Sequence, residues 1–406
     1  MVRIIPTLPR DVTLLSSVLY EGVLFTAQFL PVKFDGTSIE LPDNFPAVIL
    51  KNYLQDERVS RLKIMMAGND TMNTIIFRAY GIEDQSRKSY YDLIFKLKSY
   101  ANRLRITKRV IWLGIKLENK NMIIDEKEMI NVNGKKRALA APQLFKVDRY
   151  TGISSLESGY TSKQITIYTS KEILLLFLFG LYSSFVTSLR QRDRQYYFFL
   201  MFSPEEIESM LNRLEDKEFI RRLFRTKEKV IEFLSAALNK TAVKEAILLE
   251  VYLNVELKKL IEKENLEKIS MILFKIAPEG GQPLPRSYKV YELIPVTIYR
   301  GVEFHKTIGR YIKDPETFLE KLSEKLKPEG TIFNALRNID RFSEGSNILR
   351  AVHELYRFVV LGHVEGWYAF LREIANAYRK LENSTQPQEQ KRSLRYKRIL
   401  ETFAYK

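Results

Sequence analysis

The sequence contains no cysteine among its 406 residues. This absence excludes disulfide bonds, thiolate nucleophiles, iron–sulfur clusters and zinc sites with cysteine ligands. Histidine is scarce, and the three that occur are His305, His353 and His363. His353-Glu354 begins like the H-E-x-x-H zinc motif, but Arg357 occupies the second ligand position, and a guanidinium cannot bind zinc. We therefore expect no metal site and no other cofactor.

No apolar run is long enough to span a membrane. The longest, Ile173–Val186, is about fourteen residues and is interrupted by Gly180 and two serines, whereas a spanning helix needs about twenty apolar residues. The first residues, Met1–Asp11, carry charges and prolines and lack the apolar stretch of a signal peptide. We therefore expect a cytoplasmic protein without membrane contact, and a buried helix at 173–189.

Signatures of nucleotide-binding proteins and hydrolases are missing as well. The chain has no P-loop, no G-x-G-x-x-G fingerprint and no G-x-S-x-G nucleophile elbow. Asp125-Glu126-Lys127 is similar to the end of a nuclease carboxylate–lysine motif, but the sequence shows no partner carboxylate. We therefore expect a protein that is not an enzyme and has no catalytic residue. A metal-dependent nuclease with dispersed carboxylates stays open as an alternative, because 49 acidic residues could supply them.

What the chain has in excess is positive charge. Its 65 Lys and Arg residues against 49 Asp and Glu residues leave a formal net charge of +16. Like charges in a compact chain repel one another, and a polyanionic partner is the usual compensation. Nucleic acid is therefore the expected partner. One alternative is a basic surface that is merely solvated. Another is a structural assembly protein whose positive charge pairs with acidic neighbouring proteins, without direct contact to nucleic acid.

Basic residues gather at several places, some of them beside aromatic residues. Arg190, Arg192 and Arg194 alternate just before Tyr196 and Tyr197, and in an extended segment this spacing would put the three guanidiniums on one side. Guanidiniums pair with phosphates, and neighbouring rings can stack on bases. Taken alone, each cluster could equally be a solvated face. The other candidate nucleic-acid-binding residues are Lys135, Lys136, Arg137, Arg103, Arg105, Gln282 and Arg286.

The apolar patterns predict an α+β protein, with a mixed α/β N-terminal part followed by a mainly helical C-terminal part. Segments rich in β-branched and aromatic residues predict strands at 18–34, 61–67, 74–80, 109–117, 165–168, 195–202, 269–276 and 288–299. Asn133-Gly134 indicates a hairpin turn, since both residues tolerate positive φ. Ser203-Pro204 is typical of a helix start, and helix dominates the chain from there.

These patterns divide the chain into three parts. Residues 1–202 form the expected mixed α/β domain, and residues 203–382 a mainly helical domain with a two-strand insertion near 268–299. Residues 383–406 form a polar linker, Asn383–Gln390, and a basic terminal helix. Tyr396, Ile399, Leu400 and Phe403 of that helix recur at helical spacing, so one of its faces is apolar and able to dock.

Two segments resemble a known family. They are YTSKEILLLFLFGLYSSFVTSLRQRDRQYYFFLMFSPEEI, residues 168–207, and SYKVYELIPVTIY, residues 287–299. They are similar to the large subunit of the archaeal type I-A CRISPR interference complex, a Cascade-type assembly, over roughly residues 160–300. The resemblance implies a non-catalytic subunit that helps to recognise the motif flanking the target, holds the opened DNA and recruits the nuclease-helicase. Its implied partners are target DNA, the guide RNA complex, other subunits and the nuclease-helicase. No residue-level motif carries over, so the candidate residues above rest on their chemistry.

Overall fold

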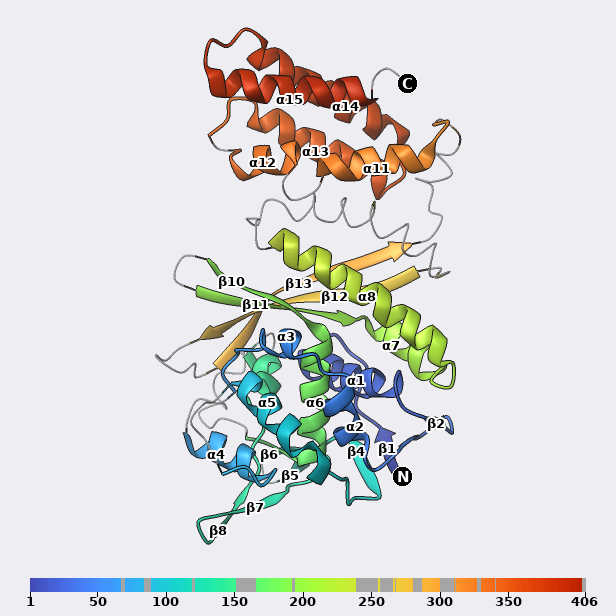
Figure 1. Ribbon diagram of the computed structural model, residues 1–406, viewed down its shortest axis with the longest axis vertical. Coiled ribbons are helices and arrows are strands. Elements are labelled where there is room, and N and C mark those ends of the chain that lie inside the picture. Colours follow the sequence, from blue (N-terminus) through green and yellow to red (C-terminus); the bar gives the residue numbers. More distant parts are fainter. Residues whose placement is uncertain are drawn as a thin grey trace. The chain divides into compact units, whose positions relative to one another are not determined.

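The computed structural model divides the chain into two compact units (Figure 1). Unit 1 comprises Met1–Phe224 and Ser270–Pro295, and unit 2 comprises Arg225–Ile269 and Val296–Lys406. The structure describes residues 1–66, 70–83, 89–118, 121–150, 166–191, 194–238, 255, 266, 268–279, 287–299, 310, 312–326, 330–339 and 341–403. The predicted α+β class is confirmed, because sheets and helices mix in the N-terminal part and helices dominate the C-terminal part.

The first sheet of unit 1 has the order β2-β3-β1-β4. Its strands are β1 (Val2–Pro6), β2 (Lys33–Phe34), β3 (Ile39–Leu41) and β4 (Val110–Leu113). β1 pairs antiparallel with β3 and parallel with β4. Alternation along β4 buries Ile111 and Leu113 and leaves Val110 and Trp112 exposed. This sheet therefore has one face on the core and one open face.

Two buried helices form the centre of unit 1. They are α1 (Leu14–Ala27) and α6 (Lys171–Ser184). A Cβ atom on Gly22 would lie 1.9 Å from the Leu176 carbonyl oxygen, and one on Gly180 would lie 2.0 Å from the Val18 carbonyl oxygen. Only glycine lets two helix backbones approach this closely. The Ser183 hydroxyl donates to Glu21 at 2.7 Å, which satisfies one oxygen of that buried carboxylate.

Three of the predicted strands of the first domain are wrong. The segment predicted as a strand at 18–34 is mostly α1, and the one at 74–80 is mostly α4 (Asp70–Arg78). Residues 61–66 form a turn and an extended segment with a single bridge from Met65 to Ser89. All residues of α1 are buried, so its sequence lacks the polar face that would reveal a helical period. The β-branched and aromatic residues of α1 therefore predict a strand, although the segment is helical.

Smaller sheets complete the lower part of unit 1 in Figure 1. One has the order β5-β6-β9, with β5 (Ile115–Glu118), β6 (Asn121–Ile124) and β9 (Ile167–Thr169). The other is the hairpin of β7 (Met129–Val132) and β8 (Lys135–Ala138). The predicted turn is confirmed, because Asn133 and Gly134 both have positive φ, 52° and 76°. The remaining helices here are α2 (Phe45–Asn52), α3 (Asp56–Val59) and α5 (Tyr90–Tyr100), with 3₁₀ segments at Ala101–Arg103 and Gln143–Tyr150.

The largest strands form a sheet of order β10-β11-β12-β13. They are β10 (Phe185–Gln191), β11 (Arg194–Phe202), β12 (Lys268–Glu279) and β13 (Ser287–Tyr299). The helix predicted at 173–189 ends at Ser184, and β10 begins at the next residue, Phe185. β12 pairs with β11, so most of the two-strand segment expected within the helical domain belongs to unit 1. The expected boundary at residue 202 falls inside unit 1, because strand partners far apart in sequence leave no local signal.

Seven described helices follow β11; α7 and the start of α8 belong to unit 1, and the others make up most of the described part of unit 2. The Ser203 hydroxyl accepts a hydrogen bond from the Glu206 amide at 3.3 Å, which confirms the predicted helix start. The helices are α7 (Pro204–Leu211), α8 (Lys217–Leu238), α11 (Pro315–Leu326), α12 (Thr331–Arg337), α13 (Gly345–Val359), α14 (Val364–Glu382) and α15 (Pro387–Phe403). No helix in the described ranges is both long and apolar enough to cross a membrane.

The terminal helix docks on unit 2. Tyr396 and Ile399 of α15 are buried in the unit 2 core, and Phe403 packs edge-on against Trp367 with ring centres 5.2 Å apart. The predicted spacer Asn383–Gln390 is shorter than expected, because α15 already begins at Pro387. Proline suits the first turn of a helix, where its missing N–H has no partner to lose.

Candidate functional site

The β10–β11 hairpin carries the first predicted arginine cluster. Arg190 lies opposite Gln195, and Gln191 lies opposite Arg194. Residues directly opposite one another share a face of the sheet, so Arg190 and Arg194 lie on opposite faces. The expectation that these guanidiniums point to one side is therefore wrong for this pair, because the chain reverses between them. Arg192 lies outside the described residues.

Arg194 joins a group that we call the cation–tyrosine cluster, made of Arg194, Tyr196, Lys275 and Tyr291. The Arg194 guanidinium donates to the Tyr291 hydroxyl at 2.5 Å and lies 5.7 Å from the centre of that ring. The Lys275 ammonium lies 4.8 Å from the centre of the Tyr196 ring. The two tyrosine rings meet edge to face at 5.7 Å. Strands β11, β12 and β13 thus contribute to one polar and aromatic surface.

The cluster has positive charge near exposed rings. Arg194 is exposed and Tyr291 is 37% exposed. The Glu292 carboxylate lies 3.7 Å from the Lys275 ammonium, whereas the Arg194 guanidinium donates to a neutral hydroxyl, that of Tyr291. The exposed Arg194 guanidinium is able to bind a phosphate, and the neighbouring Tyr291 ring is able to stack on a base, whereas the Lys275 side chain is only 12% exposed.

Tyr197, the other tyrosine of the predicted cluster, faces the interior. Its ring lies 6.2 Å from that of Tyr288, whose hydroxyl donates to the Met65 carbonyl at 2.9 Å. Burial raises the pKa of both tyrosines above the ordinary value near 10. Tyr197 therefore helps to anchor the sheet, and Tyr196 is the ring on the same face as Arg194.

The remaining predicted residues lie on separate elements. Arg103 and Arg105 are exposed after α5, and the Arg103 guanidinium lies 5.7 Å from the Tyr100 ring centre. Lys135, Lys136 and Arg137 are exposed on β8. Pairing puts Lys136 opposite Asn131, on the other face from Lys135 and Arg137. Gln282 and Arg286 lie outside the described residues.

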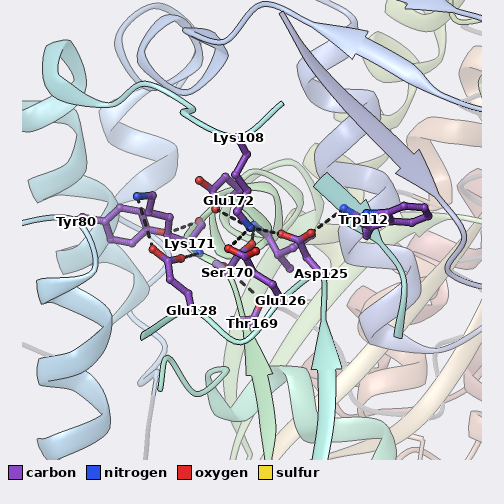
Figure 2. A network of polar contacts seen from close by, with 11 residues as sticks. Tyr80, Lys108, Trp112, Asp125, Glu126, Glu128, Thr169, Ser170, Lys171 and Glu172 are labelled. Carbon is purple, nitrogen blue, oxygen red and sulfur yellow. Dashed lines mark hydrogen bonds and ion pairs between the residues drawn. The ribbon is translucent and has the colours of Figure 1, made fainter. Parts of the chain in front are cut away.

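A buried ionic network is the second polar feature of unit 1 (Figure 2). The Lys108 ammonium lies 2.6 Å from an Asp125 oxygen, 2.7 Å from Glu126 and 3.6 Å from Glu172. Asp125 and Glu172 are buried, and Lys108 is mostly buried. Lys108 thus lies between Glu172 and the two acids of the Asp125-Glu126-Lys127 triplet. Lys108 stands among these acids, while the Lys127 ammonium lies 4.6 Å from the Tyr168 ring centre.

The network ties the β4–β6 region to the start of α6. The second Asp125 oxygen accepts the Trp112 amide N–H at 2.8 Å. Glu128 accepts the Lys171 amide N–H at 2.7 Å, and the Tyr80 hydroxyl donates to the Lys171 carbonyl at 2.8 Å. Carboxylates at a helix N-terminus are stabilised by the helix dipole. The sequence gives no signal for this arrangement, because its members are far apart along the chain.

Burial sets the charge states of this network. It raises the pKa of the Glu172 carboxyl, and the Lys108 ammonium opposes that shift only in part. Neither Glu172 oxygen accepts a hydrogen bond within the described structure. Burial also disfavours the Lys108 ammonium, but its hydrogen bonds to Asp125 and Glu126 outweigh that effect and raise the Lys108 pKa. The described residues contain no group of three or more His, Asp or Glu side chains placed to hold a metal ion.

Comparison with known proteins gives a full-length relative. The chain is 42% identical to an uncharacterized protein of Archaeoglobus fulgidus over 409 residues, which cover the whole of both chains. The chain belongs to the same family as that archaeal protein. The alignment includes both units of the fold described above. No family model matches the chain, and no solved structure is similar to it.

Proposed function

We propose that this protein is a non-catalytic, nucleic-acid-binding subunit of a larger assembly. The observation that carries the proposal is the cation–tyrosine cluster, in which an exposed arginine and a partly exposed tyrosine ring lie on one face of a sheet. Cations beside aromatic rings suit unpaired bases, because phosphates meet the charges and bases stack on the rings. The net charge of +16 supports a polyanionic partner.

The assembly we propose is an RNA-guided antiviral interference complex. The resemblance of residues 168–207 and 287–299 to the large subunit of the archaeal type I-A complex supports it. In that role the protein would help to recognise the target-flanking motif, hold the opened DNA and recruit the nuclease-helicase, while the guide RNA reads the target sequence. Arg194 and Tyr196 of the cation–tyrosine cluster lie in the first of these segments and Tyr291 in the second, whereas Lys275, on β12, lies between them.

Salt titration of binding to a labelled single-stranded oligonucleotide tests the contact. In a plot of log affinity against log salt concentration, the Arg194→Ala variant should have a slope that is shallower by roughly 0.7, which is the contribution of one phosphate contact to a single strand. Tyr291→Ala should weaken binding by about 1–3 kcal/mol without changing the slope, because stacking releases no counterions. Lys63→Ala, which removes an exposed cation elsewhere on unit 1, is the control and should leave affinity and slope nearly unchanged.

Other outcomes would favour the alternatives. Equal slopes for Arg194→Ala and the native protein would remove the cluster from the interface. Cleavage of DNA or RNA by the pure protein with Mg²⁺ or Mn²⁺ would favour the nuclease. Purification from the native host should recover a guide-length RNA together with protein subunits. Co-elution of proteins without nucleic acid would favour a structural assembly protein.

A further inference from the structure

The β7–β8 hairpin is a basic feature of unit 1 that lies apart from the cation–tyrosine cluster. Its ten residues, Met129–Ala138, include three cations and neither an acidic nor an aromatic residue. Figure 1 shows the hairpin at the lower tip of unit 1, beyond the other described elements of that unit. No acid among the described residues pairs with its cations, which are Lys135, Lys136 and Arg137. Unpaired positive charge gathered on a projecting hairpin indicates an anionic partner.

Burial along β7 fixes the orientation of the hairpin. Ile130 and Val132 are only 9% and 8% exposed, and β7 packs against α4. The strand pairing continues past the hairpin, because the Leu139 amide donates to the Glu128 carbonyl at 2.8 Å. The Glu128 carboxylate also accepts the Lys171 amide N–H at 2.7 Å, which ties the hairpin to the start of α6. The hairpin is therefore positioned before a partner arrives and loses little entropy when it binds.

The face of the hairpin opposite these buried residues is open. Alternation places Met129, Asn131 and Lys136 on this outward face, with Asn131 directly opposite Lys136. Met129 is 51% exposed, and the other two side chains are exposed as well. Lys135 and Arg137 lie on the other face yet stay exposed along β8. The hairpin thus combines an outward face of an amide, a cation and an apolar group with two further cations on β8.

From this geometry we propose that the β7–β8 hairpin binds double-stranded DNA as a two-stranded ribbon in the major groove. That groove is about 12 Å wide and admits such a ribbon. Asn131 and Lys136 would contact base edges, whereas Lys135 and Arg137 would contact the flanking phosphates. This inference rests on the proposed nucleic-acid-binding function and adds to it a second surface, which takes a duplex.

The chemistry of the hairpin favours duplex DNA over other anions. An unpaired strand needs aromatic rings on which its bases stack, and the hairpin has none, whereas the bases of a duplex are already stacked on one another. Duplex RNA has a deep, narrow major groove that side chains cannot read. An acidic protein would satisfy only the cations, whereas base edges also complement the Asn131 amide and the Met129 side chain.

Salt titration of binding to a labelled DNA duplex of mixed sequence tests the proposal on the full chain. Lys135→Ala/Arg137→Ala should make the slope of log affinity against log salt concentration shallower by about 1.8, which is twice the contribution of one phosphate of B-form DNA. The matched control, Lys33→Ala/Lys63→Ala, removes two exposed cations elsewhere on unit 1 and should leave the slope unchanged. Both variants should keep the native melting temperature, because all four side chains are exposed.

Two further measurements locate the contact. Methylation of guanine N7, an acceptor in the major groove, should weaken binding of the native protein by about fivefold or more. Asn131→Ala/Lys136→Ala, which removes the side chains facing the base edges, should respond less to this methylation. Affinity for a single-stranded oligonucleotide should be unchanged in Lys135→Ala/Arg137→Ala, because the cation–tyrosine cluster binds that ligand.

Three results would overturn the proposal. The first is no binding of the duplex, or a native salt slope in Lys135→Ala/Arg137→Ala. The second is equal affinity for methylated and unmodified duplexes, which would place the contact outside the major groove. The third is binding of polyglutamate as tight as that of the duplex and equally weakened in Lys135→Ala/Arg137→Ala, which would indicate an acidic protein partner. Arg194→Ala with a single strand tests the cation–tyrosine cluster separately, so failure of either surface is distinguishable from failure of the other.

Discussion

At the scale of single residues, two buried features of unit 1 have opposite consequences for substitution. Gly22 and Gly180 sit where the backbones of α1 and α6 almost touch, and no side chain fits there. Glu172 is a buried acid whose carboxylate oxygens accept no hydrogen bond from the described residues. The glycines are required by packing, whereas the charge of Glu172 costs stability.

Gly180→Ala should destabilise the protein by about 1–3 kcal/mol or more, because its new methyl group meets the Val18 carbonyl oxygen and a backbone cannot move aside like a side chain. Chemical denaturation measures the change. Ser17→Ala on α1 is the control. Its buried hydroxyl finds no hydrogen-bond partner in the described ranges, so removal should be neutral or stabilising. A native-like Gly180→Ala protein would contradict the close crossing.

The pH dependence of stability tests Glu172. Its folded pKa is raised, so ionisation destabilises the fold above that pKa, and the penalty disappears as the pH falls to the ordinary value of 4.5. Glu172→Gln should therefore raise the melting temperature at pH 7, and the difference from the native protein should shrink towards pH 4.5. Lys108→Met should lower the melting temperature at pH 7, because it leaves the Asp125 carboxylate buried without its cation. A lower melting temperature of Glu172→Gln at pH 7 would contradict this reasoning.

At the scale of elements, α15 combines a buried anchor with a basic outer face. Arg392 binds the buried Glu344 carboxylate at 2.8 Å, and the Tyr396 hydroxyl donates to the same oxygen at 3.2 Å. Burial, with the nearby Glu344 charge, raises the pKa of Tyr396 far above its ordinary value. Lys391, Arg395 and Arg398 are exposed at helical spacing. The helix thus docks on unit 2 while its charges face outward.

Charge and docking of α15 can be separated by substitution. Replacing Lys391, Arg395 and Arg398 together by Ala should lower oligonucleotide affinity and flatten the salt dependence, with an unchanged melting temperature. Ile399→Ala should lower stability by about 2–5 kcal/mol, because it removes buried methyl groups from the unit 2 core. If the triple variant binds with native affinity and slope, the outer face of α15 is only solvated.

At the scale of the whole molecule, the chain passes between the two units three times, after residues 224, 269 and 295. A cut at a single point therefore cannot separate them. β12 returns from a distant part of the sequence to pair with β11, where Phe199 lies opposite Phe274 and Phe202 opposite Met271. Unit 1 is incomplete without this returning segment.

Fragments of the chain test this division. Residues 1–202 alone should aggregate, because β11 becomes an edge strand with Phe199 and Phe202 at its exposed border. A protein that joins residues 1–224 to 270–295 through a Gly/Ser linker should be soluble and unfold in one cooperative transition. Circular dichroism and thermal melting compare the two. A cooperatively folded 1–202 fragment would restore the boundary that the sequence suggests.

The sequence by itself determined the features that depend on neighbouring residues. The turn at Asn133-Gly134, the helix start at Ser203-Pro204 and the amphipathic helices of unit 2 all follow from contacts within about four residues, which the sequence displays directly. The α+β class and the exposure of the predicted basic residues that the structure describes follow from the same local patterns.

Only the tertiary structure decided which distant residues meet. α1 reads as a strand because complete burial removes the polar face on which helical periodicity depends. Arg190 and Arg194 lie on opposite faces of the sheet because of where the hairpin turns. A shift of one residue in strand register would move every side chain of the strand to the other face. Lys108, Asp125 and Glu172, like Arg194, Lys275 and Tyr291, come together only through long-range packing. The physical reason is that such contacts are selected by burial and pairing of the whole chain, for which no local stretch of sequence carries a signal.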